Sequence, residues 1–585
     1  MKNPFSVKTP ETLSAADIAA SFIDVFSDFQ KILDPSHTFI HGPRGTGKSM
    51  MLRYLEPEVQ IAAKKVRRAR ELDFFAVHIP IKSSYYSIGD LGMLDGAAAG
   101  LLSEHFLVIN IATEIISSLD AFTDFTEQER QSFLQQCGQL MEEVGFEGSE
   151  EAAPSNFNKL SQILKLEYKL TKKYISTLTF TKTLIPYEAT LLTYGEFLEP
   201  LIHLIRQLEV TPTGPIFLML DDADNLPVTM QQVVNGWVSY RSTENICLKI
   251  STQQRYRTWR TPSGMLIESS HDFSEIDISS VYTSKQSSHY YDNVEKVILR
   301  RLSLAGINDV TPSQFFPSNE EQDRCLTRIK AQIGNEWDQG RGISARRSDD
   351  ILRYSTSEYM KGLAAKKKQN HFSYAGFRSL VDISSGTIRG FLEPAALMYS
   401  ELQAKDPNPR INQIPAETQD RVLSKWSQSL ILEGFERLKN DINTTENGES
   451  DDVEKLRSLI NGIGELFQAK LVSNDSERRL IAFMVTQSLS KSTQNVLDLA
   501  VEWGYFHVKT IGRKEGVGRN RAYILNRRLA PYFKLDPSGY AAYISITPKD
   551  LELAMTNHRM FTQKRLSNTE ESKPSEFSQP EIPLL

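Results

Sequence analysis

Short apolar segments alternate with helical stretches in the first half of the chain. Residues 37–41 have apolar Phe39 and Ile40 at their centre and lead into a glycine-rich turn and a helix, and residues 74–81 alternate before becoming continuously apolar. Further apolar segments of strand length lie at residues 215–220, 245–250 and 272–278. Continuous apolar strands separated by helices are typical of a parallel sheet covered on both faces. The pattern therefore predicts an α/β fold.

We expect this α/β core to span residues 1–282 and to contain a mostly helical insertion at residues 83–211. An acidic loop is predicted around residues 145–154. The most apolar helix of the insertion, residues 97–122, contains four polar or charged positions: Glu104, His105, Glu114 and Asp120. These interruptions predict a core helix rather than a membrane span.

The second half of the chain is predicted to be mainly helical. We expect a helical lid at residues 283–400, with polar loops up to about residue 350, and then a connector at residues 401–455. Residues 456–556 contain a helix followed by two short strands around a glycine-rich turn, which predicts a winged helix. Residues 557–585 are rich in Ser, Glu and Pro, a composition that predicts a disordered tail.

Length, charge and cysteine usage narrow the class of protein. A chain of 585 residues is too long for one core, so about three or four domains are expected. The formal net charge of -6 means that any nucleic-acid surface has to be local. Three scattered cysteines, Cys137, Cys247 and Cys325, indicate reduced thiols. No apolar signal segment opens the chain, so we expect a cytoplasmic protein without a membrane partner.

A phosphate-binding motif follows the first strand. It reads Gly42-Pro43-Arg44-Gly45-Thr46-Gly47-Lys48-Ser49 and satisfies G-x-x-x-x-G-K-[ST]. The preceding strand, and the helix that continues through Met50, argue against a chance glycine turn. Backbone N–H groups of such a loop bind phosphate oxygens, while Lys48 reaches the β- and γ-phosphates and Ser49 can bind magnesium. The motif predicts ATP and Mg²⁺ as cofactors.

Acidic and hydroxyl residues end the third and fourth apolar strands. Asp221 is placed to hold the magnesium that Ser49 also binds, and Asp222 to orient or polarise the attacking water. Thr252, or alternatively Ser251, is placed to hydrogen-bond the γ-phosphate or the water. A polar strand end without a catalytic role explains this hydroxyl pair equally well.

Several arginines are candidates for contact with the γ-phosphate. Arg389 opens a helix after a turn, and a fixed arginine there can couple the nucleotide state to domain position. Arg255, Arg257 and Arg260 follow the fourth strand, where one could act on the phosphates of a neighbouring subunit. Solvated surface arginines are the simpler interpretation of these three residues.

The predicted wing is strongly basic. Eight Lys or Arg lie between Lys509 and Lys534 against the single acid Glu515. Basic side chains on a wing can bind phosphates without reading bases, whereas Asp498 and Glu502 on the preceding helix would repel DNA. Contact with nucleic acid, DNA rather than RNA, and contact with a protein therefore both stay open. The candidate nucleic-acid residues are Arg513, Lys514, Arg519 and Arg521.

Taken together, these motifs resemble the origin-recognition-complex-like AAA+ ATPases, most closely the bacterial members that border on the STAND signalling ATPases. The resemblance covers the core and lid well and the winged helix moderately, but not the insertion. It implies that Lys48 and Ser49 are Walker A residues and that Asp221 and Asp222 form Walker B. It also implies Thr252 or Ser251 as sensor 1 and Arg389 as sensor 2.

The resemblance has two departures, and it leaves several functions open. Asp222 stands where many AAA+ motors have Glu, which favours slow, switch-like hydrolysis, and no arginine finger can be assigned. The leading hypothesis is an ATP-dependent switch, working as a homo-oligomer on nucleic acid or an effector protein. Proteins similar to relatives of this kind occur in antiphage defence loci, so the hypothesis includes a role as the ATPase component of such a defence system. The alternatives are a replication-initiator-like DNA-loading ATPase and a non-hydrolysing ATP-bound scaffold.

Overall fold

The computed structural model describes residues 3–24, 29–64, 66–82, 91, 94–122, 124–146, 154–180, 186–240, 246–253, 256–278, 287–341, 347–365, 371–405, 411–444, 450–473, 479–485, 487–512, 519–538 and 542–571. The chain forms two compact units. One comprises Lys8–Ser279 and is called the P-loop unit below. The other comprises Met1–Val7 with Ser280–Leu585 and is called the C-terminal unit. Each unit has its own hydrophobic core.

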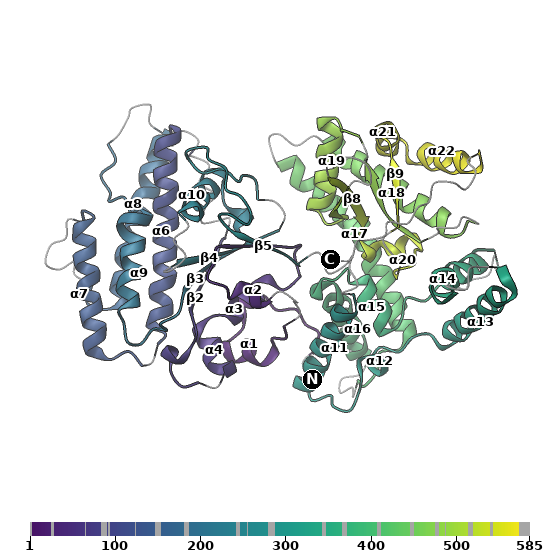
Figure 1. The fold of residues 1–585 in the computed structure, drawn as a ribbon, viewed down its shortest axis with the longest axis horizontal. Coiled ribbons are helices and arrows are strands. Elements are labelled where there is room, and N and C mark those ends of the chain that lie inside the picture. Colours follow the sequence, from purple (N-terminus) through teal and green to yellow (C-terminus); the bar gives the residue numbers. More distant parts are fainter. Residues whose placement is uncertain are drawn as a thin grey trace. The chain divides into compact units, whose positions relative to one another are not determined.

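A five-stranded parallel sheet forms the centre of the P-loop unit, with the order β2-β3-β4-β1-β5 (Figure 1). The α/β fold predicted from the apolar segments is therefore confirmed. Since all strands run parallel, their carboxyl ends share one edge of the sheet. The strands are β1 (Thr38–His41), β2 (Phe75–Pro80), β3 (Ile216–Asp221), β4 (Ile246–Thr252) and β5 (Ser274–Asp277).

Helices cover both faces of this sheet, because successive strand residues point to opposite sides. On β3, Phe217 and Met219 join one apolar cluster, while Leu218 and Leu220 join another. The first cluster includes residues of α2 (Phe29–Ile32) and α3 (Lys48–Tyr54). The remaining early elements are η1 (Pro10–Thr12), α1 (Ala15–Ser21), α4 (Pro57–Lys64) and η2 (Ala69–Glu71).

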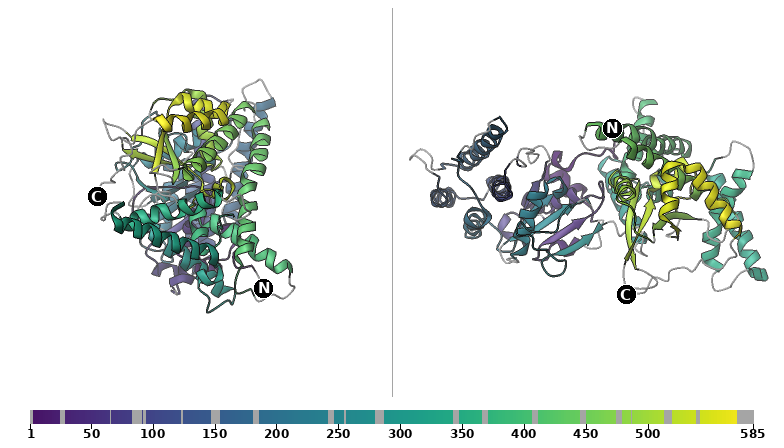
Figure 2. Two further views of the ribbon diagram at one scale, coloured as in Figure 1. Left: turned by 90° about the vertical axis from the view of Figure 1, so that its right-hand side faces the viewer. Right: turned by 90° about the horizontal axis from the view of Figure 1, so that it is seen from above.

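The insertion is helical in its described residues, as predicted, and its long helices lie together on one side of the sheet (Figure 2). The helix α6 is long and apolar enough to cross a membrane, but 67% of its apolar window is buried within the protein. Its polar residues have internal partners: Glu104 accepts hydrogen bonds from Tyr194 N and Trp237 Nε1. The expectation of a core helix is confirmed. The elements from here to β4 are α6 (Gly96–Asp120), α7 (Glu127–Glu143), α8 (Phe157–Phe180), η5 (Tyr194–Leu198), α9 (Glu199–Arg206), η6 (Ala223–Asn225) and α10 (Val228–Ser239).

Helices dominate the C-terminal unit. The buried ring of Phe5, from the first residues of the chain, packs against Phe315, Phe316 and Tyr399. The helices are α11 (Ser287–Leu304), α12 (Pro312–Phe315), α13 (Glu320–Glu336), η8 (Trp337–Arg341), α14 (Arg347–Ala365), α15 (Phe377–Ile383), α16 (Ile388–Lys405), α17 (Ala416–Thr444) and α18 (Ser450–Leu471).

The polar region before residue 350 is largely helical, so the prediction of loops there is wrong. The side chain of Asn319 caps α13 by accepting from Gln322 N. The helix then packs along α14 and presents most of its polar surface to solvent. A helix with one narrow buried face carries few apolar residues, which is why its composition resembled that of a loop.

The chain ends in a small sheet with the order β7-β8-β6-β9. The helix α19 leads into the antiparallel hairpin of β7 and β8, so the predicted winged helix is confirmed. Two further strands, β6 and β9, were not predicted, and they pair in parallel. The elements are β6 (Leu480–Val485), α19 (Lys491–Glu502), β7 (Phe506–Gly512), β8 (Arg519–Leu525), η10 (Arg527–Leu529), α20 (Ala530–Phe533), β9 (Ala542–Ile546) and α21 (Pro548–Thr556).

The predicted disordered tail begins with a helix, α22 (His558–Glu571), so that expectation is corrected for these residues. Phe561 is fully buried in the core of the C-terminal unit. Lys564 Nζ donates to Asp550 Oδ1 at 2.8 Å. The buried ring and the ion pairs of Lys564 and Arg565 with Asp550 therefore fix a segment whose composition is otherwise polar. The rest of the predicted tail, residues 572–585, lies outside the described residues.

Candidate nucleotide and metal site

The phosphate-binding motif forms the turn between β1 and α3. Gly45 and Gly47 have positive φ angles of 84° and 102°, conformations that favour glycine. Thr46 Oγ1 donates to Pro43 O at 3.0 Å, which closes the turn internally. Gly42 N donates to Thr252 O at 3.1 Å, which ties the loop to the end of β4. The turn therefore directs backbone N–H groups and the start of α3 toward one point, the geometry of an anion site.

Lys48, the first residue of α3, lies inside this turn. Its Nζ donates to Gly42 O at 2.7 Å and to Pro43 O at 3.3 Å. Burial lowers the pKa of the Lys48 ammonium, while the carboxylates of Asp222, Asp221 and Asp224 oppose that shift. The loop thus holds a buried amine next to the three acids that follow β3.

Asp221, the last residue of β3, is buried and receives several hydrogen bonds. Ser251 Oγ donates to its Oδ1 at 2.5 Å, and His78 Nε2 lies 3.1 Å from its Oδ2. Burial raises the pKa of this carboxyl, but hydrogen bonds from His78, Ser251 and Ser49 outweigh it, so the net pKa is lowered. The carboxylate is therefore ionised, and Ser49 lies close enough to contribute to its lowered pKa.

The Ser49 hydroxyl and the Asp221 carboxylate are oxygen donors of the kind that Mg²⁺ prefers. Within the described part of the chain, no group of three or more His, Cys, Asp or Glu is arranged to hold a metal ion. The residues therefore fit a magnesium ion that takes two ligands from the protein and the others from phosphates and water.

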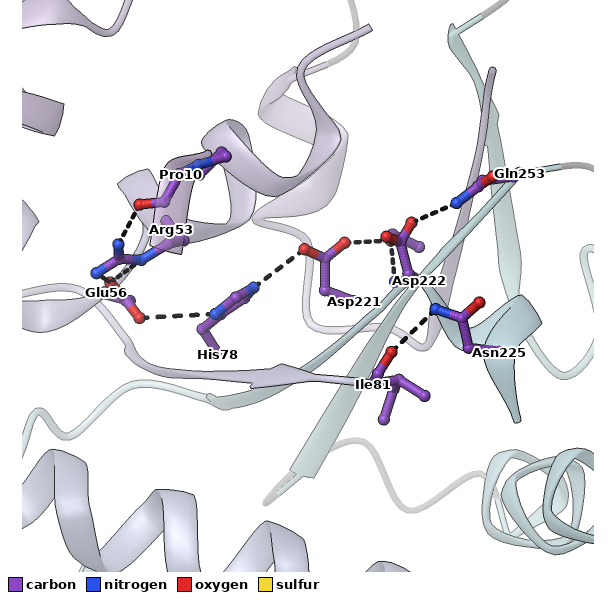
Figure 3. A network of polar contacts seen from close by, with 10 residues as sticks. Pro10, Arg53, Glu56, His78, Ile81, Asp221, Asp222, Asn225 and Gln253 are labelled. Atoms are coloured by element: carbon purple, nitrogen blue, oxygen red, sulfur yellow. Dashed lines mark hydrogen bonds and ion pairs between the residues drawn. The ribbon is translucent and has the colours of Figure 1, made fainter. Parts of the chain in front are cut away.

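Asp222 follows in a left-handed backbone conformation, with φ 58° and ψ 46°. Its N–H donates to Ser251 Oγ at 2.8 Å, and its Oδ1 accepts from Gln253 Nε2 at 2.9 Å (Figure 3). Gln253 Oε1 in turn accepts from Arg44 Nε at 2.7 Å, and Gln253 N donates to the Asp224 carboxylate. Gln253 therefore connects the phosphate-binding loop to both acids.

The sequence analysis did not identify Gln253. Its spacing two residues after Ser251 was a partial signal, but its contacts with Asp222 and Arg44 depend on how the elements come together.

The two hydroxyl residues left open as alternatives point to opposite sides of β4. Ser251 contacts Asp221 and Asp222, as described above. Thr252 Oγ1 instead lies 2.6 Å from His41 Nδ1, and His41 Nε2 lies 3.6 Å from Glu275. The interaction with His41 is the main cause of the lowered pKa of Glu275. Ser251, not Thr252, belongs to the group of side chains around the acids.

The other candidate residues belong to other elements or lie outside the described residues. Arg389 is exposed in the first turn of α16, in the C-terminal unit. Arg260 Nη1 donates to Gly264 O at 2.8 Å, while Arg255 lies outside the described residues. On the wing, Arg521 is exposed on β8. The side chain of Arg519 and all of Arg513 and Lys514 lie outside the described residues.

The parallel sheet, the glycine turn with its buried lysine and the acids at the end of β3 define the class as a P-loop nucleoside triphosphatase. The family model described as ORC-CDC6-like matches residues 3–546, so the chain belongs to this family of AAA+ ATPases. No curated protein matches the chain.

Solved structures also match over nearly their whole length, at low identity. The Aeropyrum pernix Orc1 protein in complex with DNA shares 10% identity, with 95% of this chain and 93% of that chain covered and a TM-score of 0.26. Cdc6p from Pyrobaculum aerophilum shares 13%, with 93% and 96% covered and a TM-score of 0.28. The Aeropyrum pernix ORC2 protein in its ADP form shares 10%, with 96% and 98% covered and a TM-score of 0.28.

Proposed function

We propose that this AAA+ ATPase is an ATP-dependent switch that couples its nucleotide state to engagement of DNA. The observation that carries the proposal is the position of Ser49 close to Asp221, beside the buried Lys48. Lys48 and the loop N–H groups bind the phosphates, and Ser49 and Asp221 hold Mg²⁺. The ion supplies neutralisation of phosphate charge when bound.

Asp222 orients the attacking water in this proposal. Gln253 and Ser251 fix its side chain and its backbone, respectively. The Asp222 carboxylate is one methylene shorter than the Glu of many related motors, which favours slow turnover. Slow turnover suits a switch, because the ATP-bound state then persists long enough to act on a partner. Arg389 is our candidate for the γ-phosphate contact that distinguishes the ATP-bound state from the ADP-bound state.

Nucleotide binding and phosphate release test the switch. We expect Lys48→Ala to abolish ATP binding, and Asp222→Asn to lower phosphate release while leaving binding within about threefold. The control removes the same charges from an exposed ion pair of the same unit, as Lys64→Ala and Asp73→Asn. Full ATP binding by Lys48→Ala would refute the proposal. Absence of turnover in the wild type, with and without DNA, would favour the non-hydrolysing scaffold.

The basic wing supports DNA as the partner. Charge reversal at Arg513, Lys514, Arg519 and Arg521 should weaken binding uniformly across sequences and flatten its dependence on salt. Measurement of DNA affinity at several salt concentrations checks this. Binding that is insensitive to salt, or binding to an effector protein alone, would assign the wing to protein contact.

Two settings for such a switch remain to be distinguished. ORC-CDC6-like membership favours a replication-initiator-like loading role, whereas the resemblance to bacterial defence ATPases favours an antiphage role in the cytoplasm. Phage plating on cells that carry the wild type or Lys48→Ala separates them. Only a defence role predicts protection that is lost with Lys48. Molar mass with and without ATP tests the expected homo-oligomer.

A further inference from the structure

A chain of polar contacts runs from Asp221 to the first segment of the P-loop unit (Figure 3). His78, on β2, faces Asp221 with Nε2 and lies 4.0 Å from Glu56 Oε1 with Nδ1. Arg53, on α3, donates from Nε to Glu56 Oε2 at 3.0 Å. Its Nη1 donates to Pro10 O at 2.5 Å and to Leu13 O at 3.2 Å. The contacts thus link four segments that are far apart in sequence.

In this chain of contacts, the end formed by His78 and Asp221 is buried from solvent. The side chains of His78 and Asp221 are only 5% and 4% exposed. Because an ionised carboxylate can only accept, His78 Nε2 carries the proton and donates to Oδ2. Oδ1 already accepts from Ser251. Each carboxylate oxygen is therefore held by a donor from a neighbouring strand, which fixes the direction of the carboxylate.

The other end of the chain is anchored to backbone. Arg53 donates hydrogen bonds to two backbone carbonyls, those of Pro10 and Leu13. Both belong to residues 8–14, the segment in which the polypeptide enters the P-loop unit after Val7. Glu56 pairs with Arg53 Nη2 at 3.0 Å as well, so the guanidinium has little freedom. Any shift of Asp221 can therefore reach residues 8–14 through one histidine, His78, and one ion pair, Arg53–Glu56.

We propose that His78 is a positioning residue for Asp221, and that Glu56 and Arg53 tie this pair to the crossing segment, residues 8–14. The inference rests on the proposed function, since it concerns the magnesium site. Magnesium binding depends on the direction of the Asp221 carboxylate, which His78 holds. The contacts of Glu56 and Arg53 connect His78 to the crossing segment and help to order it. By linkage, each stabilises the other.

Two substitutions at His78 separate a positioning role from a packing role. His78→Leu fills the space without a donor, whereas His78→Gln keeps an N–H at a similar reach. Titration of Mg²⁺ against the protein bound to a non-hydrolysable ATP analogue measures metal affinity directly. We expect His78→Leu to weaken Mg²⁺ binding about 10–100-fold, the range for removal of a partner of a metal ligand. His78→Gln should recover most of the affinity, and binding of the analogue without metal should be unchanged.

Hydrogen exchange of residues 8–14 tests the other end of the chain. In the wild type, Mg²⁺ added to the analogue complex should slow exchange there, and Glu56→Gln should abolish this slowing. The matched controls are the exposed Glu58→Gln on α4 and His203→Gln on α9. Both should behave as wild type.

Wild-type Mg²⁺ affinity in a folded His78→Leu would overturn the positioning role. If His78→Leu does not fold, the other two variants decide. The positioning role would be overturned if His78→Gln failed to bind Mg²⁺ while Glu56→Gln bound Mg²⁺ normally and kept the slow exchange of residues 8–14. Failure of the wild type to bind Mg²⁺ with nucleotide is a different result, because it would refute the proposed function itself.

Discussion

A single hydroxyl connects the two acids of the site. Ser251 Oγ donates to Asp221 Oδ1 and accepts from Asp222 N, so it fixes the side chain of one acid and the backbone of the other. Asp222 needs this support, because its left-handed conformation is uncommon for a residue with a side chain. The position of the catalytic candidate thus depends on a residue that need not touch the nucleotide.

Replacement of Ser251 by Ala should therefore lower hydrolysis about 10–100-fold, the range for loss of an orienting hydrogen bond at a metal site, while ATP binding changes little. Steady-state phosphate release and ATP titration on the same sample check this. Thr252→Val provides the comparison, because Thr252 contacts His41 on the other face of β4. A larger loss of hydrolysis in Thr252→Val than in Ser251→Ala would return sensor 1 to Thr252.

Buried histidines make the protein sensitive to acid. Nδ1 of His105 accepts from Leu192 N at 2.9 Å, so the neutral ring donates from Nε2 toward Thr171 Oγ1 at 3.0 Å. Burial lowers the pKa of His105 from 6.5 to about 4. Below pH 6.5 the unfolded chain takes up a proton that the folded chain refuses, so stability is lost as the pH falls from 6.5 toward 4.

At pH 5 this loss amounts to about 2 kcal/mol for His105. His105→Asn retains an acceptor near Nδ1 but does not titrate. The difference in unfolding free energy between pH 7.5 and pH 5 should therefore shrink by about that amount in the variant. Denaturant unfolding at both pH values measures it, and an unchanged difference would show that His105 is not the titrating group.

Local sequence was enough to predict Lys48, Ser49 and Asp221 as site residues. A phosphate-binding turn and an acid at the end of an apolar strand can each be recognised from a few consecutive residues. Gln253 and His78 were missed for a physical reason. Their contacts with Asp222 and Asp221 depend on the order and register of strands, for example Pro80 opposite Asp221. Neither is encoded in a short stretch of sequence.

At the scale of elements, the strands were easier to predict than the polar helices. Strand β3 is buried at every position and stands out as a continuous apolar run. Helices α13 and α22 have polar surfaces, and a few tertiary contacts decide their structure. In α22 the decisive residue is Phe561, which packs into the core near Gly462.

Phe561→Ala should destabilise the C-terminal unit by about 3–5 kcal/mol, the usual cost of removing a buried aromatic ring. Exchange-rate measurements should also show α22 detached, because its other residues are mostly exposed. Met560→Ala is the control, since that neighbouring side chain is 55% exposed. Equal effects of the two substitutions would argue that α22 does not depend on the buried ring.

At the scale of the whole molecule, each unit has a separate core, so we expect two calorimetric transitions. ATP with Mg²⁺, at 100 times its Kd, raises the free energy of unfolding of the unit that binds it by about 2.7 kcal/mol. Under the switch proposal, ATP with Mg²⁺ should raise the midpoint temperatures of both transitions in the wild type. Arg389→Ala should confine the rise to the P-loop unit. A rise confined to that unit in the wild type would mean that the C-terminal unit makes no contact with the nucleotide.

The packing of Phe5 among Phe315, Phe316 and Tyr399 has a consequence for synthesis on the ribosome. Met1–Val7 belongs to a unit whose other residues begin at Ser280. The nascent chain therefore emerges with its first aromatic ring lacking a partner, while Lys8–Ser279 already has the residues it needs to fold. The candidate nucleotide site can thus form during translation, before the C-terminal unit is complete.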